Sequence, residues 1–116
     1  MKDHTRRAVA YVAARLVSGQ QASSVYDYAT GRHVNFSGTV SSTNVNVFDY
    51  EQAAHISGSP PSLFHYGNGA HLRLATQGTT FKGFDYDTGS HFTGRVNGRS
   101  VSLFDYETST HYNYTV

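Results

Sequence analysis

The chain has 116 residues, a formal net charge of +1, 38% hydrophobic residues and no cysteine. This length has room for one domain, and the lack of cysteine excludes disulfides and thiolate metal sites. Nine tyrosines and seven phenylalanines are present, so the composition excludes a large aliphatic core. No apolar run reaches the roughly 18 residues that a spanning helix needs, so we expect no membrane span.

Residues 1–20 predict an amphipathic helix. Asp3 suits a cap at its start, and Gly19 suits the position just past its end. A basic start followed by an apolar run is also typical of a secretion signal, but Arg15 interrupts the run and favours a retained helix. We expect one apolar stripe of this helix to pack on a β-sheet, with a membrane-surface helix as an alternative. The stripe consists of Val9, Val12, Ala13, Leu16 and Val17.

Charge is divided unevenly along the chain. Residues 1–20 hold four basic residues and one acidic residue, a net charge of +3, whereas residues 21–116 hold five basic and seven acidic residues, a net charge of −2. Binding to many phosphates requires a dense basic face, which residues 21–116 lack. The sequence therefore predicts no nucleic-acid partner.

A short motif occurs five times from residue 25 onward. Each copy has an aromatic residue, then Asp or His, then Tyr, and the copies span residues 25–28, 47–50, 63–66, 83–86 and 103–106. A polar turn and a histidine follow each time, at His33, His55, His71, His91 and His111. The last two copies begin about 20 residues apart, which is the length of two short strands with two tight turns. The repeating unit is therefore strand, turn, strand.

The turns indicate antiparallel pairing. Asn97-Gly98 is typical of a two-residue type I′ hairpin, which would place Val96 opposite Arg99 and Gly94 opposite Val101. Asp87-Thr88-Gly89-Ser90 suits a four-residue hairpin loop.

We therefore predict an all-β domain over residues 21–116, an antiparallel meander of ten short strands that curls or closes into a barrel. Pro60-Pro61 must be a connection. A β-solenoid is the alternative, but the copies are spaced by 16 to 22 residues, which coils of constant length accommodate poorly. The predicted strands are 24–28, 33–38, 44–50, 55–58, 62–66, 71–75, 79–86, 91–96, 99–106 and 111–116.

Side-chain alternation separates two faces of the sheet. The predicted core face carries Phe92, Val96, Val101 and Leu103, together with the repeated aspartates. The opposite face carries the aromatic residues and histidines of all five copies, together with Arg73 and Arg95. Aromatic pairs stabilise neighbouring strands, and this face is either structural, partly covered by the helix, or a surface that binds a carbohydrate, another flat ligand or a protein.

The repeated histidines and aspartates do not predict chemistry. Equivalent histidines would lie two strands apart, about 9.5 Å, whereas zinc ligands lie about 2.1 Å from the ion. Asp followed six residues later by His resembles an acid–base pair, but its repetition indicates that Asp accepts backbone hydrogen bonds at each turn. No nucleotide-binding or nucleophile motif occurs. We expect a non-catalytic protein with no metal and no cofactor.

The third copy departs most from the repeat, because it replaces Asp with His65, has two glycines in its loop and adds an arginine. The alternative to a role in binding is sequence drift in a copy that tolerates it. The candidate ligand site of this copy consists of Phe64, His65, Tyr66, His71 and Arg73.

The sequence favours a structural, self-assembling or protein-interaction module, with carbohydrate or small-ligand binding on the aromatic face as the alternative. The last predicted strand, 111–116, has no Lys, Glu or Pro to discourage pairing at a sheet edge. The aromatic face would also need a cover. We therefore expect a homo-oligomer that forms through strand edges.

Overall fold

The computed structural model describes all 116 residues as one helix followed by ten strands. All ten predicted strands are confirmed, with ends that agree to within two residues. Pro60-Pro61 lies in the connection between the fourth and fifth strands, as expected. The elements are α1 (Asp3–Ser18), β1 (Ser24–Asp27), β2 (Arg32–Val40), β3 (Val45–Asp49), β4 (Ala54–Ser59), β5 (Ser62–His65), β6 (Ala70–Gln77), β7 (Thr80–Asp85), β8 (Ser90–Asn97), β9 (Ser100–Asp105) and β10 (Thr110–Thr115).

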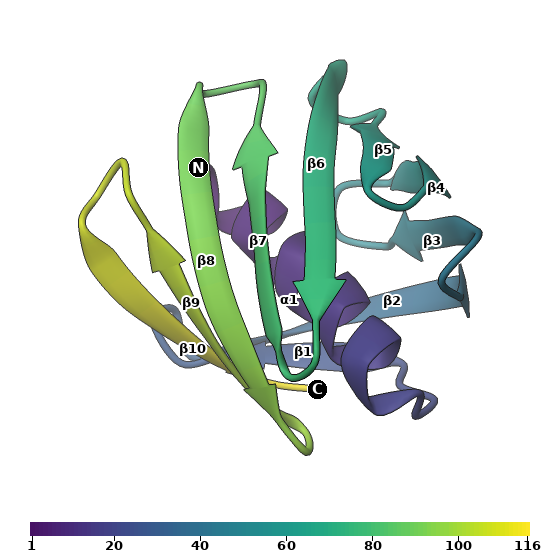
Figure 1. The fold of residues 1–116 in the computed structure, drawn as a ribbon, viewed down its shortest axis with the longest axis horizontal. Coiled ribbons are helices and arrows are strands. Elements are labelled where there is room, and N and C mark those ends of the chain that lie inside the picture. Colours follow the sequence, from purple (N-terminus) through teal and green to yellow (C-terminus); the bar gives the residue numbers. More distant parts are fainter.

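The strands form a closed antiparallel barrel (Figure 1). Each strand pairs with its neighbours in sequence, and β1 pairs with β10 through Tyr26 opposite Thr115 and Asp27 opposite Tyr114. The predicted meander is thus confirmed in its closed form, and the solenoid alternative is wrong. Closure also removes both sheet edges, so the expected self-association through strand edges has no basis in this fold.

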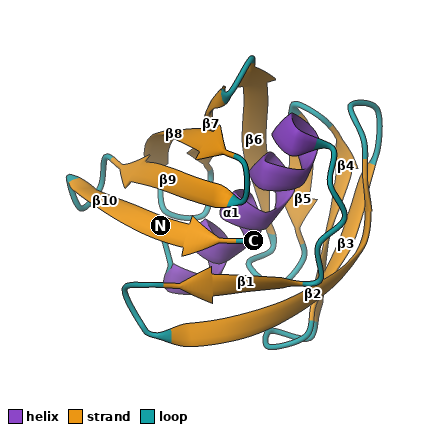
Figure 2. Cartoon of the chain, turned by 90° about the horizontal axis from the view of Figure 1, so that it is seen from below, coloured by secondary structure: helices purple, strands orange, loops and turns teal.

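The helix α1 lies inside the barrel, with the strands wrapped around it (Figure 2). Every residue from Thr5 to Arg15 is buried. The sequence pattern predicts a helix with one apolar stripe on a sheet, but here the whole circumference is enclosed, and the helix covers no part of the aromatic face. Alanines suit this position because their side chains are small, and Ala8, Ala10, Ala13 and Ala14 are all buried. The helix is also too short and too polar to cross a membrane.

The ends of α1 match the prediction in part. Gly19 adopts a left-handed conformation with a φ of 68°, and its N–H donates to the carbonyl of Arg15, as expected for a residue just past a helix. Asp3 is not the cap, because the helix begins at that residue and the Asp3 carboxylate contacts Arg6 one turn later. The predicted N-terminal cap is therefore wrong.

The inner face of the barrel is the predicted core face. Val96 lies opposite Val101 and Gly94 lies opposite Leu103, so the predicted register is wrong by two residues, although the faces stay the same because the shift is even. The turn consists of Gly98 and Arg99, with Gly98 at a φ of 61°. A glycine at the first of two loop positions is typical of type II′ rather than type I′.

Two glycines in β7 and β8 make room for core rings. A Cβ atom on Gly94 would lie 2.1 Å from Cζ of Phe81, and one on Gly83 would lie 2.5 Å from Cζ of Phe92 and 1.8 Å from the carbonyl oxygen of Arg73. No side chain fits at these distances. Both glycines therefore allow this part of the wall to pack closely around the two phenylalanines.

Candidate functional site

Each of the five copies places three rings on the outside of the barrel. The histidine lies directly opposite the strand aromatic residue of its copy, as His91 does opposite Phe84. The tyrosine that ends the motif, two residues further along the chain, also contacts this strand residue. Ring centroids in all ten contacts are 4.6–5.0 Å apart. We call each set an aromatic triad.

The tyrosines of the triads are the most exposed large apolar side chains. Each retains 54–60% of its accessible surface, and they are Tyr28, Tyr50, Tyr66, Tyr86 and Tyr106. Exposed aromatic groups with a polar tip are typical of interaction surfaces. The outer wall, and not the filled interior, is therefore where a ligand could bind.

The structure divides the predicted site of the third copy between the two sides of the wall. Phe64, Tyr66 and His71 form the outer triad, with ring centroids 4.8 and 5.0 Å apart, and Arg73 is exposed on the same side of β6. His65 is buried in the interior. Four of the five predicted residues thus share the outer surface, and His65 does not join them.

Contacts with α1 account for the departure at His65. Its Nδ1 accepts a hydrogen bond from the backbone N–H of Asn68 at 3.2 Å, which is the role that aspartate has in the other copies. The Asn68 side chain in turn donates to Thr5 at 2.8 Å and contacts the His4 ring at 2.7 Å. A Cβ atom on Gly67 would lie 3.1 Å from Cε1 of His65. The glycine at position 67 therefore leaves room for the imidazole of His65.

Burial lowers the pKa of His65 from 6.5 to about 4, with the neighbouring His4 adding to the effect. A buried imidazole loses hydration that its charged form needs. Its Nε2 is buried and has no hydrogen-bond partner. His65 is therefore neutral at physiological pH and acts in packing.

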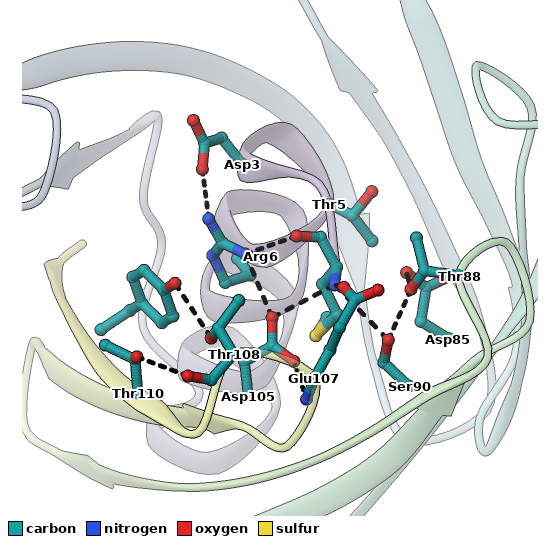
Figure 3. A network of polar contacts seen from close by, with 12 residues as sticks. Asp3, Thr5, Arg6, Asp85, Thr88, Ser90, Asp105, Glu107, Thr108 and Thr110 are labelled. Carbon is teal, nitrogen blue, oxygen red and sulfur yellow. Dashed lines mark hydrogen bonds and ion pairs between the residues drawn. The ribbon is translucent and has the colours of Figure 1, made fainter.

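The repeated aspartates all point inward, where they form a charged cluster at the end of the barrel that holds the start of α1. Asp27 accepts from Arg7 Nε at 2.9 Å. Asp105 accepts from Arg6 at 3.1 Å (Figure 3), and also from the Met1 amino group at 3.2 Å. The three basic groups and both carboxylates are buried. The positive segment of the sequence thus neutralises the acidic one within the fold.

Two aspartates of this cluster have no cation within ion-pair distance. Asp49 accepts from the backbone N–H groups of Glu51 and Gln52, and its other oxygen has no partner. Asp85 accepts from the backbone of Asp87 and from the Thr88 hydroxyl. Burial raises the pKa of both carboxyl groups. As expected from the sequence, Asp accepts backbone hydrogen bonds at each turn.

No aspartate meets the histidine that follows it. In the fourth copy Asp85 is buried inside the barrel, whereas His91 is exposed on the outer wall, and the same separation holds in the other copies that carry Asp. The Asp–His pairs therefore have no shared site in which to exchange a proton. Nowhere do three histidine or acidic side chains come close enough together to hold a metal ion.

The outer wall of β6 to β10 contains a shallow groove. It consists of two adjoining hollows of about 530 and 410 Å³ that share Ala75, Lys82 and Thr93. The backbones of Gly83 and Gly94 form part of its floor. We call this surface the outer groove.

Three rows of facing residues cross the outer groove. The middle row runs from β6 to β10 and contains Ala75, Lys82, Thr93, Phe104 and His111. The row on one side contains Thr80, Arg95 and Ser102. The row on the other side contains Arg73, Phe84 and His91. The groove therefore combines basic, hydroxyl and aromatic side chains.

Among the five residues of the site predicted from the sequence, only Arg73 lines the outer groove. The motif does not identify three further residues of the groove, because they lie outside it: Lys82, Thr93 and Arg95. Only the register of β6, β7 and β8 brings them together. A position-by-position comparison of the five copies would have marked the two cations as unusual.

No protein-family model matches the sequence, and neither a curated protein nor a solved structure matches it significantly.

Proposed function

We propose that the protein is a non-catalytic carbohydrate-binding module that recognises its ligand in the outer groove. The groove carries the proposal, because two hollows of about 530 and 410 Å³ have the size of ligand sites. Hydroxyl side chains such as Thr80, Thr93 and Ser102 can donate to and accept from sugar hydroxyls. Phe104 and Tyr106 supply apolar surface for a sugar ring.

The rest of the molecule supports this placement. The interior is filled by α1 and leaves no room for a ligand, and the outer groove contains no carboxylate. A histidine without an acidic partner is a weak basis for hydrolysis. Recognition without reaction is therefore the function that this surface supports best.

A glycan array followed by isothermal titration calorimetry tests the proposal. Tyr106→Ala should weaken binding about fivefold, since loss of an aromatic contact costs about 1 kcal/mol. Tyr50→Ala is the matched control, because Tyr50 has the same place in its copy, is similarly exposed and lies outside the outer groove. Equal effects of the two variants, or no binding to any glycan, would contradict the proposal.

A second candidate is self-association through the outer wall, because five half-exposed tyrosines surround the barrel. Aromatic patches of this kind also bind other protein surfaces. Light scattering during size-exclusion chromatography distinguishes the two candidates. A mass of two or more chains, reduced by Tyr50→Ala and Tyr106→Ala alike, would favour a homo-oligomer over a glycan-binding monomer.

A further inference from the structure

Three cations of the outer wall form a diagonal across β6, β7 and β8. Arg73 lies opposite Phe84, two residues from Lys82, and Lys82 lies opposite Thr93, two residues from Arg95. Diagonal neighbours of this kind in a sheet are about 7–8 Å apart. The basic diagonal, Arg73, Lys82 and Arg95, therefore presents three positive charges at a regular interval.

No acidic side chain neutralises the basic diagonal. The ion pairs of the molecule involve only the Met1 amino group, Lys2, Arg6, Arg7 and Arg32. Arg73, Lys82 and Arg95 are all exposed. Arg32 makes a useful contrast, because this exposed arginine of β2 pairs with Glu51.

The fold does not require a cation at any of the three positions. The residues equivalent to Arg73 in the other copies are Asn35, Ser57, Thr93 and Asn113. Those equivalent to Lys82 are Ser24, Asn46, Ser62 and Ser102. Those equivalent to Arg95 are Ser37, Ser59, Ala75 and Thr115. Every other copy builds the same strands with small uncharged residues, so three neighbouring departures from the repeat indicate a role in binding.

We infer that the ligand is an acidic polysaccharide, whose carboxylate or sulfate groups bind along the basic diagonal. This inference rests on the proposed function and names its substrate class. An extended chain with a charge on successive or alternate units can meet several cations at once, and Arg is well suited to bidentate contact with such oxygens. The neutral Thr80, Thr93 and Ser102 remain for the hydroxyl groups between the charges.

A single-stranded nucleic acid fits the groove less well. Such ligands stack successive bases on aromatic faces. The strand rings of the groove, Phe84 and Phe104, are half-buried, and each already contacts a histidine and a tyrosine edge-on or tilted, which leaves Tyr106 as the one exposed tyrosine that lines the groove. Hydroxyl side chains outnumber free rings along the basic diagonal, which favours a ligand rich in hydroxyl groups.

Reversion to the repeat tests the inference without disturbing the fold. Calorimetric titrations would use heparin and polygalacturonate oligosaccharides, with dextran as the neutral ligand and a thymidine oligonucleotide as the competing polyanion. Arg73→Ser, Lys82→Ser and Arg95→Ser should each weaken binding of an acidic oligosaccharide about fivefold, the upper range for an exposed ion pair. The triple variant should no longer bind the acidic oligosaccharide, whereas Arg32→Ser should bind it as the parent does. Melting temperatures of the variants should stay close to that of the parent.

The outcomes separate this inference from the proposed function. Equal binding of dextran and the acidic chains, unchanged in the triple variant, would overturn the inference and keep the carbohydrate-binding function. Binding of the oligonucleotide alone would overturn both. Binding of heparin or polygalacturonate that Arg32→Ser weakens as much as Arg95→Ser would overturn the basic diagonal as the site, because the effect would then reflect net charge.

Discussion

Two aspartates at equivalent positions of the repeat should respond differently to the same substitution. Asp27 pairs with the buried Arg7, whose Nε lies 2.9 Å from its Oδ2. Asp49 has only backbone donors on one oxygen and no partner on the other. Replacement by Asn keeps the shape of each side chain and its accepting oxygen, and removes the charge.

Asp27→Asn should destabilise the protein by about 3 kcal/mol, because removal of one partner from a buried ion pair leaves the other charge uncompensated. This value is at the lower end of the usual cost of breaking a buried ion pair, because Arg7 would keep its contact with Glu51 at 2.9 Å. For a chain of this size the loss corresponds to a melting temperature about 10 °C lower. The free energy of unfolding of Asp49→Asn should be within about 1 kcal/mol of the parent value or higher than it, because the substitution removes a buried charge that has no counter-ion.

Urea unfolding followed by circular dichroism measures both changes. The raised pKa of Asp49 adds a pH signature. A carboxyl group whose pKa is higher in the folded state destabilises that state as pH rises through this pKa. The free energy of unfolding of Asp49→Asn, relative to that of the parent, should therefore increase between pH 3 and pH 7. Equal losses of stability for the two variants at pH 7 would refute the reasoning, since they would mean that the charge of Asp49 stabilises the fold as much as that of Asp27.

Three further predictions concern stability and are checked by urea or thermal unfolding. Since burial lowers the pKa of His65 from 6.5 to about 4 in the folded state, stability should be complete above pH 6.5 and should fall by up to about 3 kcal/mol as pH falls to 4. His65→Asn should remove this slope, and an unchanged slope would assign it to other groups. Gly98→Val should cost more than about 1 kcal/mol because a β-branched residue resists positive φ, and no loss would contradict the observed turn. Ala10→Leu should cost about 1–3 kcal/mol or more by overpacking the enclosed helix, whereas a tolerated leucine would show that α1 is loosely held.

The strands could be predicted because their signals are local. The five-fold motif, the alternation of side chains and the glycine turns each act over a few residues, and all ten strands follow from them. Barrel closure could not be predicted in the same way. It depends on the pairing of Tyr26 with Thr115, which lie at opposite ends of the repeat region and carry no pattern that marks them as partners.

The position of α1 is the main error, and its cause is charge. Arg6, Arg7 and Arg15 suggest a helix with a solvated side, but all three are buried. The carboxylates that pair with Arg6 and Arg7 come from distant parts of the chain, Asp105 and Asp27. Arg15 instead donates to Tyr11 and Gln21 nearby and to the carbonyl oxygen of Gly38. The sequence did contain a relevant signal, since alternation places the aspartates on the core face and the two segments have opposite net charges.

The motif predicts only part of the candidate site. The motif predicts which aromatic residues and histidines share the outer face, and the structure agrees. The third copy draws attention because it differs at His65, but that difference serves packing against α1. The departures at Lys82 and Arg95 lie outside the motif, and their proximity to Arg73 depends on the register between strands.

The distribution of acidic residues links the interior of the barrel to its outer wall. Asp27, Asp49, Asp85 and Asp105 point inward beside the start of α1, and the remaining acids lie in that helix or in the adjoining turns. Cations on the wall of β6 to β8 therefore have no acidic neighbour. Charges about 7–8 Å apart lie within the screening length of about 8 Å at physiological ionic strength, so the basic diagonal repels itself until an anion binds. Affinity for an acidic chain should accordingly fall as salt is added, whereas affinity for a neutral sugar should not.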